Sequence, residues 1–187
     1  MLVFTGKTAS GKTTVLKALE RNGCYSRIIT YTTRPPRSDE KNGDDYYFVS
    51  DDVFQMLEDY GYFAETSNYY ASSGKRYRYG SPLHLYNTTY GMIALDINGV
   101  ISLRENSNAH NVQNILIIYL MVPEELLLQR LRNRGDSEEE IKRRMDHDRE
   151  AFREIWSYCD LVIKVGEKDT VDDIVGTVEK AVANAGF

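Results

Sequence analysis

The residues with the clearest chemistry lie near the start of the chain, in the stretch GKTASGKT from Gly6 to Thr13. The stretch fits the pattern G-x-x-x-x-G-K-[ST], in which glycines let the backbone point several N–H groups at one phosphate. The ammonium group of Lys12 can reach the β- and γ-phosphates, and the hydroxyl of Thr13 suits Mg²⁺. A glycine-rich turn without a ligand is the alternative, but an apolar run before the stretch and an amphipathic run after it disfavour that alternative. The pattern therefore predicts a site for a nucleoside triphosphate with Mg²⁺.

A second candidate anion site follows in TTRPPR, at 32–37. Two prolines stiffen the turn between Arg34 and Arg37, and a rigid pair of guanidiniums suits bidentate capture of a phosphate. The same arginines could instead be solvated surface side chains. Further along, Glu65 offers a carboxylate, which accepts two hydrogen bonds from a base that has both an amino group and a ring N–H. Guanine has that edge and adenine lacks it, so these residues indicate a guanine nucleotide as the second ligand.

The elements that must position these residues are predicted to form an α/β fold with a parallel core sheet. Apolar runs predict buried strands at 2–5, 27–31, 92–96, 115–122 and 161–165. Capping residues and periodicity predict helices at 12–22, 52–60, 123–135, from 137 onward, and at 170–183, with Ser50 as the N-cap of the second. Because strands and helices alternate, we expect right-handed crossovers and a ligand site at the carboxyl ends of the strands.

Composition excludes several classes of function. The net charge of −5 disfavours a sequence-independent nucleic-acid binder. The longest apolar run, at 115–122, is too short to span a bilayer, and the first strand follows Met1 directly, which leaves no room for a signal peptide. With only Cys24 and Cys159 present, a reducing cytoplasm is expected. The histidines are expected to be surface or packing residues rather than ligands: His84, His110 and His147.

Taken in order, the motifs resemble those of guanylate kinases, which are nucleoside monophosphate kinases of the P-loop NTPase superfamily. The shared motifs are the phosphate loop, TTRPPR, NGDDYYFVS, FAE, YGS, LDINGV and RLRNRG…IKRRM, which together cover nearly the whole chain. The resemblance implies transfer of the γ-phosphate of ATP to GMP, giving ADP and GDP, with Mg²⁺. It also implies a three-layer P-loop sandwich in one domain, 1–187. The core would comprise 1–31, 91–123 and 159–187, with an inserted GMP-binding lobe at 32–90 and a helical lid at 124–158.

The resemblance also implies a role for each matching residue. The expected ATP-binding residues are Gly6, Thr8, Ala9, Ser10, Gly11, Lys12, Thr13 and Thr14, of which Thr13 would also contact the metal. The expected GMP phosphate contacts are Arg34, Arg37, Tyr46 and Tyr79, the guanine contacts are Glu65 and Ser81, and Thr30 would contact the phosphate or base region. The expected catalytic residues are Lys12, Asp96, and the lid arginines Arg134 and Arg144.

Three departures from the family pattern leave alternatives open. The segment between Glu65 and Tyr79 is about five residues longer than usual, one aspartate stands where the family often has two, and Val165 and Gly166 replace an asparagine near the adenine. One alternative is a related kinase for dGMP, IMP or another acceptor. Another is a non-catalytic binding module, which the intact phosphate loop disfavours. The expected partners are ATP and GMP, without nucleic acid or membrane, in a protein that is a monomer or a homodimer.

Overall fold

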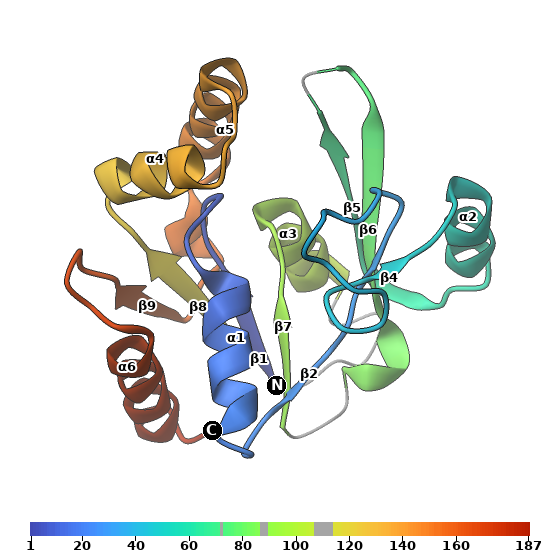
Figure 1. Ribbon diagram of the computed structural model, residues 1–187. Helices are drawn as coiled ribbons and strands as arrows, with labels where there is room; N and C mark the ends of the chain where they lie inside the picture. The colour runs from blue at the N-terminus through green and yellow to red at the C-terminus, as the bar shows by residue number, and fades with distance from the viewer. Residues whose placement is uncertain (72, 87–89, 107–113) are drawn as a thin grey trace.

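The computed structural model describes residues 1–71, 73–86, 90–106 and 114–187. Its core is a five-stranded sheet in which every neighbouring pair is parallel (Figure 1). The strand order is β2 (Ser26–Arg27), β7 (Gly91–Ala94), β1 (Leu2–Thr5), β8 (Leu116–Met121) and β9 (Leu161–Lys164). The predicted parallel α/β core is confirmed.

Helices cover both faces of this sheet. Alternate residues of β1 point to opposite sides, so Leu2 and Phe4 pack against α1 (Lys12–Arg21) and α6 (Val171–Asn184) on one face. On the other face, Val3 packs with α3 (Ile97–Asn106). Figure 1 shows α1 and α6 side by side on their face, and the result is a three-layer sandwich.

A second, four-stranded sheet stands beside the core. Its order is β4 (Tyr47–Phe48), β3 (Tyr31–Thr32), β6 (Arg76–Pro82) and β5 (Phe63–Tyr70), and the connection between β4 and β5 contains helix α2 (Asp51–Asp59). Ser50 caps α2, as predicted, by accepting a 3.3 Å hydrogen bond from the backbone N–H of Val53. The antiparallel pair β5–β6 forms a ribbon that rises well above the rest of this lobe (Figure 1). A 3₁₀ turn, η1 (Leu83–Leu85), follows the ribbon.

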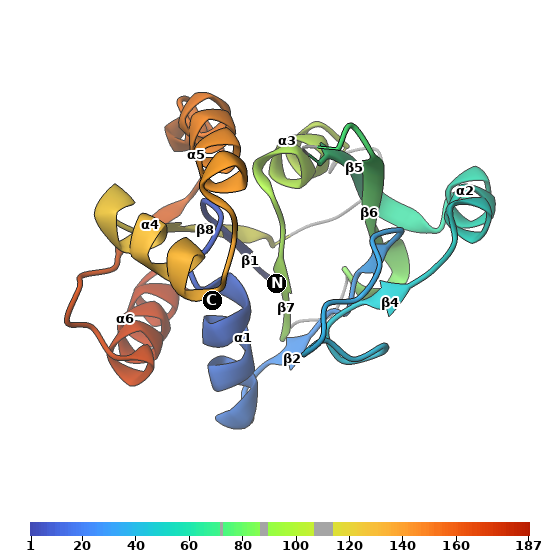
Figure 2. The same cartoon turned by 45° about the horizontal axis from the view of Figure 1, so that its top comes forward.

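The remaining helices form a lid over one end of the core sheet. Helix α4 (Glu124–Asn133) follows β8, and α5 (Glu138–Ala151) follows a turn at Gly135, where φ is +84°. A second 3₁₀ turn, η2 (Ile155–Ser157), leads into β9. In Figure 2, α4 and α5 lie on one side of the phosphate loop and the ribbon lies on the other. None of the helices in the described part of the chain is long and apolar enough to cross a membrane.

Two predictions from local pattern are corrected. The single strand expected at 27–31 is wrong, because the chain changes sheets within it. The N–H of Ile28 donates to Met92 O of the core sheet, at 2.8 Å, whereas Thr30 O accepts from Tyr47 N of the lobe, also at 2.8 Å. The strand expected at 92–96 ends at Ala94, and Asp96 instead precedes helix α3, which the sequence pattern did not predict.

Candidate functional site

The phosphate loop joins β1 to α1 in a tight, concave turn. Ala9 and Gly11 both have left-handed backbone conformations, with φ of +63° and +92°. At Gly6, a Cβ atom would lie 2.6 Å from Ser10 Oγ and 3.0 Å from Leu120 O, so only glycine fits without a shift. Left-handed residues beside a helix N-terminus turn consecutive N–H groups to the same side, which makes an anion-binding concavity.

The Lys12 ammonium lies inside this loop. It donates to Gly6 O at 2.5 Å and to Lys7 O at 3.3 Å. Burial lowers the pKa of Lys12, while the carboxylates of Asp148 and Asp96 act in the opposite direction. The cation is therefore held close to both carboxylates and to the phosphate loop.

A cleft of about 240 Å³ opens between the phosphate loop, the four-stranded sheet and the lid. It is lined by most of the residues that the sequence singled out: Thr8, Ala9, Lys12, Thr13, Thr30, Arg34, Arg37, Tyr46, Glu65, Tyr79, Asp96, Arg134 and Arg144. Ser67 and Tyr69 also line it, and sequence reasoning did not identify them. Side chains that are up to 136 positions apart in the sequence, Thr8 and Arg144, thus face one cavity.

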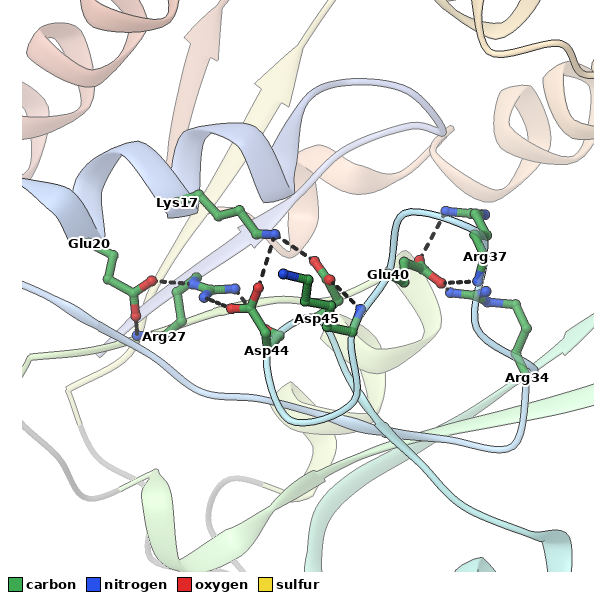
Figure 3. A network of polar contacts seen from close by, with 9 residues as sticks. Lys17, Glu20, Arg27, Arg34, Arg37, Glu40, Asp44 and Asp45 are labelled. Atoms are coloured by element: carbon green, nitrogen blue, oxygen red, sulfur yellow. Dashed lines mark hydrogen bonds and ion pairs between the residues drawn. The ribbon is translucent and has the colours of Figure 1, made fainter.

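Glu40 holds the two arginines on one wall of the cleft, Arg34 and Arg37 (Figure 3). Its carboxylate accepts from Arg34 Nη2 and from the backbone N–H of Arg37, both at 2.8 Å. Burial raises the pKa of Glu40, but the hydrogen bonds from Arg34 and Arg37 outweigh it and hold the pKa below its usual value. The ring of Tyr46 lies 5.5 Å from the Arg34 guanidinium carbon, and its centroid is 6.0 Å from that of Tyr79. Sequence reasoning missed Glu40, although its spacing of three from Arg37 was a usable signal.

Two arginines of the lid, Arg134 and Arg144, lie near the same wall of the cleft. Partial burial, and then the nearby guanidiniums of Arg34 and Arg134, lower the pKa of Arg37. Arg144 acts on Arg37 in the same direction. The Nε of Arg134 donates to Asp136 at 3.1 Å, which holds its side chain in place. Guanidiniums that repel one another in the free protein favour a bound anion, because the anion relieves the repulsion.

At the far end of the cleft, Glu65 is only 4% exposed. Ser81 Oγ donates to Glu65 Oε1 at 2.5 Å and lies 2.5 Å from the Tyr86 hydroxyl. Burial raises the pKa of Glu65 to about 8, with a further contribution from Asp96, while the Ser81 hydrogen bond acts against both. Ser81 itself is fully buried behind Glu65 and does not line the cleft.

Asp96 has a structural contact on each of its oxygens. Its Oδ1 accepts from Gly99 N at 2.7 Å, which caps the start of α3, and its Oδ2 accepts from Ser67 Oγ at 3.1 Å. Asp96 has two possible roles, as a capping residue of α3 and as the site residue that the family resemblance implies. The structure places it in both settings, because the carboxylate that caps α3 also lines the cleft.

A second cavity, of about 480 Å³, lies on the other side of the phosphate loop. Its walls include Ser10, Gly11 and Thr14, together with the apolar side chains of Val171 and Ile174. Arg130 also lines it and donates to Ala9 O at 3.1 Å and Ser10 O at 3.2 Å. Four residues line both cavities: Ala9, Lys12, Thr13 and Arg134. Two spaces suited to two ligands therefore meet at the lysine and threonine of the phosphate loop.

The lid contacts the phosphate loop through Asp148, which is 6% exposed. Its Oδ2 accepts a 2.6 Å hydrogen bond from the backbone N–H of Thr8. The sequence did not single out Asp148, which lies in a strongly charged helix. The neighbouring His147 is half exposed, as is His84 at the surface, whereas His110 lies outside the described residues.

Comparisons with known proteins agree with this arrangement. A guanylate kinase family model matches residues 1–185. The guanylate kinase of Lactobacillus acidophilus is 31% identical over 188 residues, covering 96% of this chain and 87% of that protein. The guanylate kinase of Syntrophus aciditrophicus is 34% identical, covering 84% of this chain and 74% of that protein.

Solved structures show the same fold. The crystal structure of guanylate kinase from Anaplasma phagocytophilum matches with a TM-score of 0.71 at 22% identity, covering 99% of this chain and 85% of that one. A shikimate kinase from Bacteroides thetaiotaomicron matches with a TM-score of 0.57 at 15% identity, covering 97% of each chain.

The parallel sheet and the phosphate loop that follows its first strand define a protein of the P-loop α/β class. The family match over nearly the whole chain makes the assignment specific. The chain belongs to the guanylate kinase family, the ATP:GMP phosphotransferases, as its ordered motifs predicted.

Proposed function

We propose that ATP binds in the cavity beside Arg130 and that GMP binds in the cleft, so that their phosphates meet at Lys12 and Thr13. The observation that carries this proposal is that Lys12, Thr13 and Arg134 line both spaces. Phosphoryl transfer depends mainly on alignment of the two substrates and on neutralisation of charge. The phosphate loop N–H groups hold the donor, and the residues expected from the sequence, Gly6 to Thr14, supply this cradle.

On the acceptor side, the GMP phosphate lies against Arg34, Arg37, Tyr46 and Tyr79. Glu40 holds the two arginines at fixed positions, so little side-chain freedom is lost when the phosphate binds. Glu65 accepts from the amino group and ring N–H of guanine, with Ser81 and Tyr86 behind it. Thr30 lies on the same wall and is 8% exposed.

Charge on the transferred phosphoryl group is stabilised by Lys12, Arg134 and Arg144. An arginine in such a position contributes roughly 10³-fold or more to the rate. The attacking oxygen belongs to a phosphate that is already ionised, so the reaction does not require a strong general base. The negative charge of Asp96 favours the cationic form of Lys12, and its hydrogen bond from Gly99 N caps helix α3.

Mg²⁺ fits the donor atoms at the meeting point of the two cavities. The Thr13 hydroxyl and the Asp96 carboxylate are hard oxygen ligands on the cleft wall, and Thr13 is the residue that would contact the ion. Mg²⁺ binds few protein groups and takes substrate phosphate oxygens and water for the rest. When bound, it neutralises charge on the donor phosphates. The thiols of Cys24 and Cys159 are both free, in keeping with the cytoplasmic location that we propose.

A coupled assay of ADP formation over GMP, dGMP, IMP and AMP tests the acceptor. GMP should give the highest kcat/KM, because IMP lacks the amino group that Glu65 reads. The longer ribbon does not disturb this end of the lobe, where Glu65 still pairs with Ser81 in register. Equal rates with IMP, or equal ADP release without any acceptor, would contradict the proposal. Failure to bind ATP in calorimetry would instead favour the binding-module alternative.

A further inference from the structure

The longer segment between Glu65 and Tyr79 forms the far end of the β5–β6 ribbon. The two strands stay paired from Phe63 opposite Pro82 to Tyr70 opposite Arg76. This length carries the end of β5 away from the guanine-binding end and toward lid helix α5 (Figure 1). Tyr69, which lines the cleft, and the exposed Tyr70 lie at that end.

Tyr69 and Tyr70 contact the lid directly. The Tyr69 hydroxyl donates to Glu140 Oε1 at 3.2 Å and accepts from Arg143 Nη2. Arg143 Nη1 also donates to the backbone oxygen of Tyr70, at 3.1 Å. The guanidinium carbons of Arg143 and Arg144 lie 5.1 and 5.7 Å from the centre of the Tyr69 ring, within the range of cation–π attraction.

Glu140 connects Tyr69 to Arg144, which lines the cleft. Besides Tyr69, its Oε1 accepts from Arg144 Nε at 2.6 Å, and Arg143 Nε donates to its Oε2 at 2.9 Å. The Glu140 and Arg144 side chains are only 17% and 18% exposed, so water competes little for these bonds. Hydrogen bonds from Arg143 and Arg144 hold the pKa of Glu140 at about 2, which keeps the carboxylate ionised throughout the neutral range.

We propose that Tyr69 is a positioning residue that joins the GMP lobe to the lid and sets the Arg144 guanidinium in the cleft. The ribbon carries Tyr69, Tyr69 holds Glu140, and Glu140 holds Arg144. Arg144 therefore occupies its position in the cleft when Tyr69 of the lobe is hydrogen-bonded to Glu140 of the lid. This inference rests on the proposed role of Arg144 in phosphoryl transfer.

The test is a steady-state study of Tyr69→Phe, with ATP and GMP varied separately. Phenylalanine keeps the ring over both guanidiniums and removes only the hydroxyl. Loss of the hydroxyl should lower kcat about 5-fold, the equivalent of one hydrogen bond, with both KM values within about 2-fold of the wild type. Tyr70→Phe is the matched control, because Tyr70 contributes only its backbone oxygen, and its kcat should not change.

A double-mutant cycle with Arg144→Ala separates positioning from a structural role. If Tyr69 acts through Arg144, Tyr69→Phe should have no further effect on kcat in the Arg144→Ala background. An unchanged kcat in the single variant, or the same drop in both backgrounds, would overturn the positioning role. Arg144→Ala with full activity would instead overturn the proposed role of Arg144. Thermal melts of all variants identify any loss of folding.

Discussion

At the scale of single residues, the proposed contact with guanine requires Glu65 as a carboxylate, but burial favours its protonated form. With its pKa near 8, the folded protein without GMP holds a proton on Glu65 at neutral pH. Two hydrogen bonds from guanine require the ionised form, so the binding of GMP and the loss of this proton are coupled.

We therefore predict that GMP binding at pH 7 releases about one proton. Calorimetry in buffers of different ionisation enthalpy measures this release, and Glu65→Gln provides the control without a titrating group. Binding heats that do not depend on the buffer would contradict the prediction.

The same group should make the stability of the free protein pH-dependent. Between its usual pKa and 8, Glu65 binds a proton in the folded state but not in the unfolded state, so the free energy of unfolding falls as pH rises through this window. Glu65→Gln lacks this loss and should be more stable than the wild type by a few kcal/mol, on the order of 2–4, at pH 8 and by little at pH 5. Urea unfolding at both pH values measures the difference.

Asp148 supports a third prediction at this scale. Its carboxylate occupies the Thr8 N–H of the phosphate loop and would lie near the negative charge of the donor. Asp148→Asn keeps an acceptor oxygen and removes the charge, so the KM for ATP should fall about 3-fold, an effect of less than 1 kcal/mol. Asp146→Asn, at an exposed position on the same helix, is the control. A raised KM for ATP would show that the Asp148 charge assists binding.

The site residues that could be predicted from the sequence share one property. Gly6 to Thr13 form a local pattern, and the arginines of TTRPPR lie in a rigid turn, so neighbouring residues suffice to identify them. Asp148 and Tyr69 have roles only because α5 packs against the loop and the ribbon, across separations of 140 and 71 residues. Local periodicity carries no information about such contacts.

At the scale of elements, Arg78 joins β6 to helix α2. It is 5% exposed, donates to Gln55 Oε1 at 3.0 Å, forms an ion pair with Glu58, and lies 4.4 Å above the Phe54 ring. The sequence placed α2 and its cap correctly, but it did not identify this anchor, because a basic, tyrosine-rich run is typical of an exposed loop.

Arg78→Met should therefore destabilise the protein by about 1–3 kcal/mol, because it leaves the Glu58 carboxylate without its partner. Urea unfolding measures the loss. Arg76→Met, two residues earlier and half exposed with a 3.7 Å ion pair, should cost less than about 0.5 kcal/mol. Equal effects of the two substitutions would show that the burial of Arg78 contributes nothing.

The other differences between sequence and structure at this scale concern the ends of elements. Residues 27–31 have the composition of a strand, but only Arg27 and Tyr31, at the two ends, lie in strands, and hydrogen bonds to two different sheets divide the segment between them. The first turn of helix α3 contains Asn98 and Gly99, which are typical of a turn, and the helix forms because Asp96, just after strand β7, caps it. Tertiary contacts therefore outweighed local preference in both places.

At the scale of the whole molecule, a polar network attaches the GMP lobe to the core (Figure 3). Lys17 on α1 donates to Asp45 at 2.6 Å, and Arg27 on β2 donates to Asp44 at 2.7 Å and to Glu20 at 2.5 Å. Asp45 directly precedes Tyr46, so a core helix that begins at the phosphate loop holds part of the proposed GMP phosphate site.

Lys17→Ala should raise the KM for GMP about 3-fold and leave the KM for ATP unchanged, because only the acceptor loop loses its support. Combining Lys17→Asp with Asp45→Lys restores the pair in reverse and should recover most of the loss. Arg21→Ala, at the exposed end of the same helix, is the control. A change in the KM for ATP alone would refute the assignment of this network to the acceptor side.

The change of sheet at 28–30 makes this short segment a pivot for the GMP lobe. Thr30 lies on the pivot, whereas Tyr69 lies two strands away and three residues beyond Thr66, which shares its register with Gly80 and Tyr31, an arm of roughly 14 Å. A rotation of about 10° would barely displace Thr30, yet it would move the Tyr69 side chain by about 2 Å, which is enough to break its hydrogen bond to Glu140. A lobe that rotates by about 10° would therefore engage or release the lid arginine, as a latch does.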